Sequence, residues 1–150
     1  MSRGKTKKTK AGFNLTGFIA DSALSRSIAE IRGLSNESRS TEFATSVAER
    51  IEIICYDKKL KDLTGEDIAA LLIQEFEADL IIPLALSRVH KDLDSEGYFP
   101  GHLAELLLKV SPETWAKNPL LWRSTTEWIE SNRAELRSRN LKLQILDLHI

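Results

Sequence analysis

Apolar residues recur at three- and four-residue steps along most of the chain, and this spacing constrains the possible fold more than any other feature. Steps of this size place side chains on one face of an α-helix. Clear examples are Phe43, Val47, Ile51 and Ile54, followed by Ile68, Leu71, Leu72 and Phe76. We therefore predict an all-α protein, a compact antiparallel bundle of about six or seven short helices.

Capping residues set the expected helix boundaries. Thr41 and Thr64 act as N-caps in this pattern, and Ser111-Pro112 and Asn118-Pro119 each place a polar residue before a proline. Helices are accordingly predicted over residues 21–32, 41–57, 64–76, 78–93 and 103–110, then from 112 and from 119 to 136. The helix over 78–93 is the most apolar, which predicts a central place in the bundle, with Pro83 in or near its first turn.

The C-terminal part of the chain combines tryptophans with an ambiguous tail. Trp115, Trp122 and Trp128 are predicted to be core residues. In the tail, residues 141–150, apolar positions alternate as in a strand but also fit a helical spacing. The sequence leaves both conformations open, so the tail is either helical or extended.

The net charge of −1 hides a strong asymmetry. Residues 1–10 carry five basic side chains and no acid, whereas residues 61–105 hold ten acids against three bases. We predict a flexible basic leader over residues 1–12 and a single acidic helical domain over residues 13–150. A folded domain of that sign repels nucleic acid and attracts basic partners.

Residue types that usually carry catalysis are few and have no diagnostic spacing. His90, His102, His149 and the single cysteine, Cys55, match no zinc pattern, and no glycine pattern for phosphate is present. We interpret His102 as a surface histidine near a helix start and Cys55 as a small core residue. The sequence thus predicts no enzyme, metal, cofactor or small-molecule substrate. The longest apolar run, residues 80–86, is too short to span a membrane.

A more specific pattern covers residues 58–122, in three blocks. The blocks are Leu60, Leu63, Thr64, Asp67, Ile68 and Gln74; then residues 82–86 with Gly97, Phe99, Pro100, Gly101, Leu103 and Leu107; then Thr114, Trp115, Asn118, Pro119 and Leu121. In this segment the chain resembles the immunity proteins of bacterial contact-dependent growth inhibition (CDI) systems. Tyr98 and His102 depart from the family pattern, and residues 1–57 and the tail match it poorly.

The resemblance implies a cytoplasmic antidote that binds the C-terminal toxin domain of a large secreted effector and so protects the producing cell from its siblings. Many such toxin domains are nucleases, often acting on transfer RNA, with basic clefts. An acidic face could fill such a cleft, and the candidate residues are Glu66, Asp67, Glu75, Glu77, Asp79, Asp92, Asp94 and Glu96. Tyr98 and Phe99 either pack in the core, the interpretation we favour, or anchor the partner.

Two other functions remain open at this level. A small DNA-binding regulator would use the basic N-terminal arm, although the acidic body has the wrong sign for that role. A small helical enzyme would use His102 and the paired carboxylates. The expected default for scattered carboxylates is a solvated surface.

Overall fold

The computed structural model describes residues 12–147 of the chain and confirms the all-α fold. In this part, the one pairing of strand type is an isolated bridge between Ser27 and Lys59. The α-helices are α1 (Asp21–Leu24), α2 (Ile28–Ile31), α3 (Ser46–Asp57), α4 (Gly65–Ile73), α5 (Ala78–Lys91), α6 (His102–Leu107), α7 (Pro112–Lys117), α8 (Pro119–Ser131) and α9 (Arg133–Ser138). Short 3-10 helices span Leu15–Gly17, Asn36–Ser38, Leu60–Asp62 and Gln144–Asp147.

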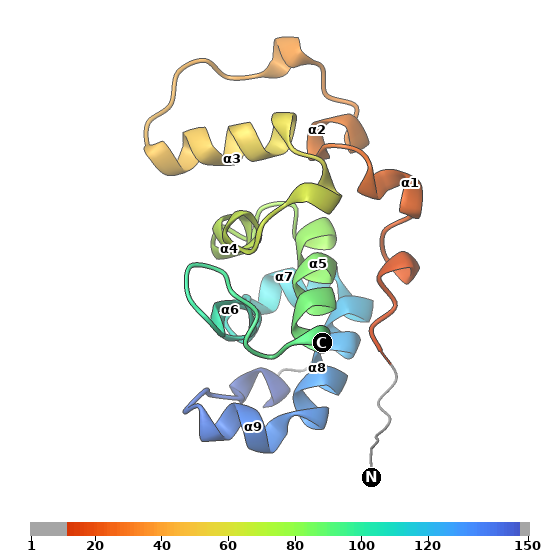
Figure 1. Ribbon diagram of the computed structural model, residues 1–150, viewed down its shortest axis with the longest axis vertical. Helices are drawn as coiled ribbons and strands as arrows, with labels where there is room; N and C mark the ends of the chain where they lie inside the picture. The colour runs from red at the N-terminus through yellow and green to blue at the C-terminus, as the bar shows by residue number, and fades with distance from the viewer. Residues whose placement is uncertain (1–11, 148–150) are drawn as a thin grey trace.

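The helix α5 lies at the centre of the molecule, as its composition predicts. Figure 1 shows it upright, with α4 and α6 beside it and seen nearly end-on, so these helices cross α5 instead of running along its axis. The helix α3 packs on α2 and α4 at one end of the molecule, and α8 packs on α5 nearer the other end. Burial explains this arrangement, because eight of the residues of α5 are buried, from Leu80 to Val89.

Two of the predicted caps are confirmed. The hydroxyl of Thr64 accepts a hydrogen bond from the Asp67 N–H at 3.1 Å, and the Asp67 carboxylate accepts one from the Thr64 N–H at 3.0 Å. This reciprocal capping box satisfies two N–H groups that the first turn of α4 leaves without helical partners. The Ser111 hydroxyl likewise caps α7 by accepting from the Thr114 N–H.

The single helix predicted over residues 21–32 is wrong, because two helices occupy this segment. Ser27 begins the second one: its hydroxyl accepts from the Glu30 N–H at 3.1 Å, and the Glu30 carboxylate accepts from the Ser27 N–H at 2.8 Å. The Arg26 carbonyl accepts from the Leu60 N–H at 2.9 Å, so a tertiary contact stabilises the break between the helices. Gly33, at φ +73°, follows α2, as predicted.

The start of α3 also differs from the prediction. The helix begins at Ser46 and not near Thr41, since Thr45 is its N-cap and accepts from the Ala48 N–H at 3.0 Å. Phe43 therefore lies before the helix.

Pro83 lies in the second turn of α5, where its ring removes one N–H from the helical ladder.

The long helix predicted from residue 119 to 136 ends early, at Ser131. Asn132 separates α8 from α9, and its side-chain amide donates to the Trp128 carbonyl at 2.8 Å. Trp128 and Trp115 are fully buried, while Trp122 is partly buried against the core, so all three tryptophans pack as predicted.

Of the two conformations expected for the tail, its described part shows a short helix, of the 3-10 type, and no strand. Residues 141–143 have no regular structure, and a 3-10 helix follows over Gln144–Asp147 with Ile145 buried. Residues 148–150 and residues 1–11, most of the predicted basic leader, lie outside the described residues.

The loop over residues 94–101 packs directly on the start of α4, and glycines make this possible. A Cβ atom at Gly65 would lie 1.8 Å from the Glu96 carbonyl oxygen, and one at Gly97 would lie 2.7 Å from the Ala69 Cβ. Gly101 adopts φ +82°, which favours glycine. The loop therefore packs closely against α4 before the chain enters α6.

This contact can be tested with Gly65→Ala, which should lower the free energy of unfolding by about 1 to 3 kcal/mol because the added methyl group overlaps backbone. Gly12→Ala is the matched control, since nothing lies within 4 Å of a Cβ at that position. Chemical denaturation measures both variants. Equal stability of the two would contradict the close seating of the loop.

Candidate functional site

The eight predicted carboxylates do not form one acidic face. They divide into four groups with different surroundings. Asp67 is buried; Glu75 bonds to α7; Glu77 and Asp79 pair with Arg32; Glu66, Asp92, Asp94 and Glu96 lie around a surface groove. The structure thus separates carboxylates used inside the molecule from carboxylates that a partner can reach.

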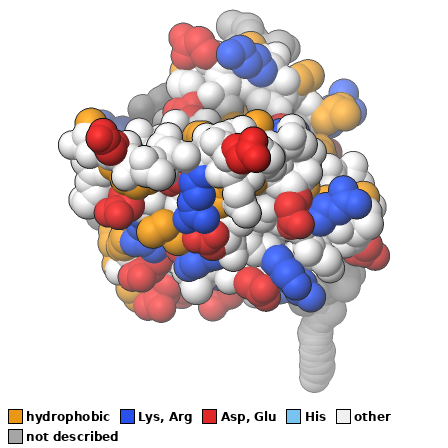
Figure 2. Space-filling view, turned by 90° about the horizontal axis from the view of Figure 1, so that it is seen from above, with side chains coloured by type: hydrophobic (Ala, Val, Ile, Leu, Met, Phe, Trp, Pro, Cys, Tyr) orange, Lys and Arg blue, Asp and Glu red, His pale blue; other side chains and the backbone are white. Residues whose placement is uncertain are grey.

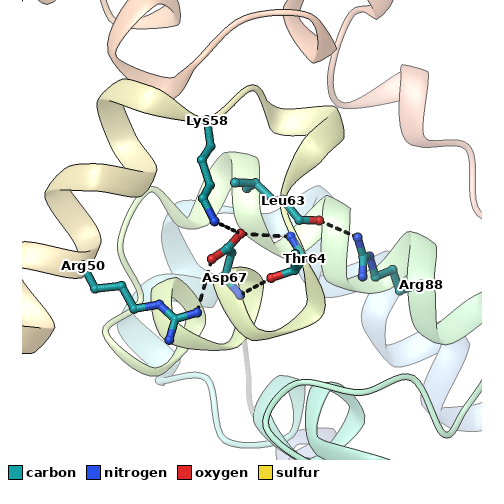
Figure 3. A network of polar contacts seen from close by, with 6 residues as sticks. All are labelled: Arg50, Lys58, Leu63, Thr64, Asp67 and Arg88. Atoms are coloured by element: carbon teal, nitrogen blue, oxygen red, sulfur yellow. Dashed lines mark hydrogen bonds and ion pairs between the residues drawn. The ribbon is translucent and has the colours of Figure 1, made fainter.

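Asp67 is the centre of an internal network, drawn in Figure 3. Asp67 is 1% exposed. Its carboxylate forms ion pairs with Lys58 at 2.8 Å and with Arg50 at 3.2 Å; Arg50 belongs to α3 and Lys58 follows its last residue. Burial raises the pKa of this carboxyl, but hydrogen bonds from Lys58, the Thr64 N–H and Arg50 outweigh it, and the pKa lies below its ordinary value. Asp67 is therefore not part of the exposed acidic surface expected from the sequence, because it is buried and its oxygens bond to these groups.

Glu75 is also engaged within the molecule. Its carboxylate accepts from the Ser111 N–H at 3.0 Å and the Ser111 hydroxyl at 2.7 Å, and from the Thr114 hydroxyl. Glu75 has a left-handed backbone, φ +51°, which costs energy for a residue with a Cβ. These bonds to the start of α7 hold the turn between α4 and α5, and they occupy both carboxylate oxygens of Glu75.

Glu77 and Asp79 share one cation at the start of α5. The Arg32 guanidinium donates to Glu77 at 2.5 Å and to Asp79 at 2.6 Å, and these bonds, those to Asp79 first, raise the pKa of Arg32. The Asp79 side chain remains 51% exposed. The pair ties α2 to α5, and its negative charge is largely balanced by Arg32 and by the positive end of the α5 dipole.

The remaining four carboxylates surround a groove of about 690 Å³ between the start of α4, the end of α5 and the 94–101 loop. Within residues 12–147, no ion pair engages Glu66, Asp92 or Glu96, whereas Asp94 pairs with Arg139. Arg88 lines the same groove, but its guanidinium donates to the Leu63 carbonyl at 2.6 Å. The groove therefore has an acidic rim whose charge is only partly balanced.

Tyr98 and Phe99 are not core residues, which corrects the interpretation favoured from the sequence. They are 47% and 46% exposed, and they follow Glu96 and Gly97 of the groove lining. The Phe99 ring stacks on the His102 ring at a centroid distance of 4.2 Å, and the Arg50 guanidinium lies 5.7 Å from the centre of the Tyr98 ring. Both rings are supported on one side and open to solvent on another.

His102 was predicted at the surface, but it is 6% exposed. Its Nδ1 accepts a hydrogen bond from the Tyr98 N–H at 3.0 Å, and burial lowers the pKa of the imidazole. A neutral ring that accepts this bond is a support for the loop. This role was not visible in the sequence, where only the position near a helix start was apparent.

Arg50 and Arg88 are the functional residues that sequence reasoning missed. Each bonds to a group far along the chain: Arg50 is 17 residues from Asp67, and Arg88 is 25 residues from Leu63. Local spacing carries no signal for such contacts. The glycines at positions 97 and 101 did carry one, since a Pro- and Gly-containing turn indicates backbone constraints.

At the end of the molecule that bears α3, the described side chains form no patch of a single charge sign. Figure 2 shows this end, where Lys and Arg side chains are interspersed with Asp and Glu. The acidic groove is thus a more distinctive feature of the surface than this face.

Comparison with known proteins identifies the family. A family model of CDI immunity proteins matches residues 34–125, more than half of the chain. The chain belongs to the CDI immunity proteins. The resemblance seen in the sequence is confirmed, and the match extends further toward the N-terminus than residue 58. No curated protein and no solved structure matches the chain significantly.

The matched region of this immunity protein runs from before α3 into α8, and it contains the Asp67 network, the groove carboxylates and the Tyr98-Phe99 pair. In the described part of the chain, no helix is long and apolar enough to cross a membrane. Membership of the family implies a toxin as partner. The Asp67 network, the groove carboxylates and the Tyr98-Phe99 pair all lie in the region that the family model matches.

The Asp67 network makes the stability of the immunity protein depend on pH. Because the pKa of folded Asp67 lies below its unfolded value, the network stabilises the fold above about pH 4 and loses this effect as the pH falls through the folded pKa. Asp67→Asn should lower the free energy of unfolding by about 2 kcal/mol at pH 7. The difference from wild type should shrink near pH 3, about one unit below the ordinary carboxyl pKa.

Thermal and chemical denaturation at both pH values measures this effect. Asp62→Asn, which removes an exposed carboxylate, is the control and should change stability by less than about 0.5 kcal/mol. A constant difference between Asp67→Asn and wild type at all pH values would show that the charge of Asp67 is not what stabilises α3 against α4.

Proposed function

We propose that this immunity protein binds the C-terminal toxin domain of a cognate CDI effector in the cytoplasm and neutralises it by occlusion, without catalysis of its own. Membership of the family supports the toxin as partner. We further propose that the toxin is a nuclease, for example one that acts on transfer RNA, because the accessible acidic groove complements a cleft that binds phosphates.

The observation that carries this proposal is a set of carboxylates that form no ion pair with any other residue of the described range, 12–147. Glu66, Asp92 and Glu96 gather around one groove, although they come from two helix ends and a loop. Leaving several like charges unpaired at one place costs stability. A basic partner would supply cations to these carboxylates on binding and so remove this cost.

The surface of eight carboxylates predicted from the sequence is thereby reduced to the groove. Asp67 and Glu75 serve the fold, and Arg32 balances Glu77 and Asp79. Asp94 is 60% exposed but already pairs with Arg139, so we assign it a secondary part. The contact surface proposed here consists of Glu66, Asp92 and Glu96, with Tyr98 and Phe99 beside them.

Long-range attraction would make such an antidote act quickly. A cluster of unpaired charges steers an oppositely charged partner and can raise the association rate by roughly tenfold or more at low ionic strength. Fast association suits an inhibitor that has to reach the toxin before the toxin reaches its substrate. The same effect makes the association rate sensitive to salt.

Neutralising the groove tests the proposal. The triple variant Glu66→Gln, Asp92→Asn and Glu96→Gln keeps side-chain shape, and the amide introduced at position 92 would still offer an oxygen to the Asp94 N–H. We expect the association rate of this variant with the toxin domain to fall about tenfold at low salt, and the difference from wild type to shrink in about 0.5 M NaCl.

Surface plasmon resonance measures these rates with the C-terminal toxin domain of the cognate CDI effector as the probe. The matched control, Glu37→Gln, Glu42→Gln and Glu113→Gln, changes the net charge equally at exposed positions outside the groove. If the control loses as much rate as the triple variant, net charge and not the groove governs association. If wild type does not bind the domain, the proposed function is wrong.

A further inference from the structure

Two neighbouring aromatic side chains project from the groove side of the molecule. Tyr98 and Phe99 each expose close to half of their surface, whereas Trp115 and Trp128 are fully buried. A single exposed apolar residue needs no explanation, whereas two adjacent aromatic rings on one surface loop form an exposed apolar patch. Such a patch indicates a contact surface.

The loop that carries the two rings is fixed by contacts of its backbone. The Tyr98 N–H donates to Nδ1 of His102 at 3.0 Å, and the Gly101 N–H donates to the Asp94 carbonyl at 3.0 Å. The Ser95 hydroxyl donates to the Asp92 carbonyl at 2.7 Å. Together with the close approach of residue 96 to the start of α4, these bonds hold the loop in one conformation before any partner arrives.

Each ring is also held in orientation by a group behind it. The Phe99 ring lies nearly parallel to the His102 ring, with an interplanar angle of 24°. The Tyr98 ring contacts His102 at a centroid distance of 5.6 Å, and Arg50, itself bound to Asp67, lies over it. Binding to a ring that is already oriented costs little conformational entropy.

We propose that Tyr98 and Phe99 are the energetic anchor of the toxin interface, and that they receive arginine or lysine side chains of the toxin's basic surface. This inference rests on the proposed function and specifies how the same surface works. The aliphatic stem of such a side chain packs on an aromatic ring, and its cation is attracted to the ring face. Glu96, two residues before Tyr98, belongs to the acidic lining of the groove.

The chain already contains one instance of this geometry, in the Arg50 guanidinium over Tyr98. The loop that carries the two rings also lines the acidic groove, at Glu96, Gly97 and Pro100, so we expect cations of a partner that bind the groove to reach the rings as well. Rings and carboxylates then have separate kinetic roles. Carboxylates attract the toxin over a distance and set the association rate, whereas buried aromatic contacts set the dissociation rate.

The test compares dissociation rates from the C-terminal toxin domain of the cognate CDI effector. Tyr98→Ala and Phe99→Ala should each raise the dissociation rate at least about tenfold, as is typical of an aromatic anchor, with little change in association rate. The effect should persist in about 0.5 M NaCl, because it does not depend on long-range attraction. Leu120→Ala is the control: Leu120 is 61% exposed, on α8, outside the groove lining.

Conservative variants separate binding from folding. Phe99→Leu keeps apolar bulk against His102 but has no ring face, so it should fold as wild type and still dissociate faster. Tyr98→Phe keeps the ring and should dissociate as wild type. Circular dichroism melting checks the fold of each variant. If Tyr98→Ala, Phe99→Ala and Phe99→Leu all dissociate from the toxin domain as slowly as wild type, the anchor is wrong and the proposed function stands. If the wild-type protein does not bind the toxin domain, both proposals are wrong.

Discussion

The buried carboxylate of Asp67 joins α4 to the α3 region. The groove and the Tyr98 ring both depend on this connection. The carboxylate caps α4 through Thr64 and at the same time holds Arg50 and Lys58 of the α3 region. A buried carboxylate is tolerated only where its lone pairs are satisfied, and removing any one partner leaves a charge in a poorly solvated place. Because Arg50 reaches from this carboxylate to the Tyr98 ring, the interior network also supports a side chain that faces solvent.

Acidic side chains in this protein perform two different tasks that look alike in the sequence. Some carboxylates accept hydrogen bonds that hold irregular segments in place, as Glu75 does for the left-handed turn before α5. Others line the groove and form no ion pair within residues 12–147, as Glu66 and Glu96 do. The first kind stabilises the isolated protein, and the second kind is the one that we propose for contact with the toxin.

The 94–101 loop connects these two tasks. Its backbone lies so close to α4 that only glycine fits at position 65, and the buried, neutral ring of His102 accepts a hydrogen bond from the Tyr98 N–H. These contacts fix the walls of the groove and the direction of the two exposed rings together. A rigid loop that presents aromatic side chains beside acids combines the contacts that give long residence with the charges that give fast association.

Local sequence patterns were sufficient to predict the helical class, the caps at Thr64 and Ser111, the central helix α5 and the family of the chain. The helical features depend on residues within about four positions of one another, where spacing and side-chain type decide the outcome. Which carboxylates remain available to a partner depends instead on the packing of distant segments. Glu75 bonds to Ser111, 36 residues away, and Glu77 to Arg32, 45 residues away. Packing likewise divided the helix predicted over 21–32, because Leu60 reaches the Arg26 carbonyl. Such partners meet only when the core assembles, and no local pattern encodes them.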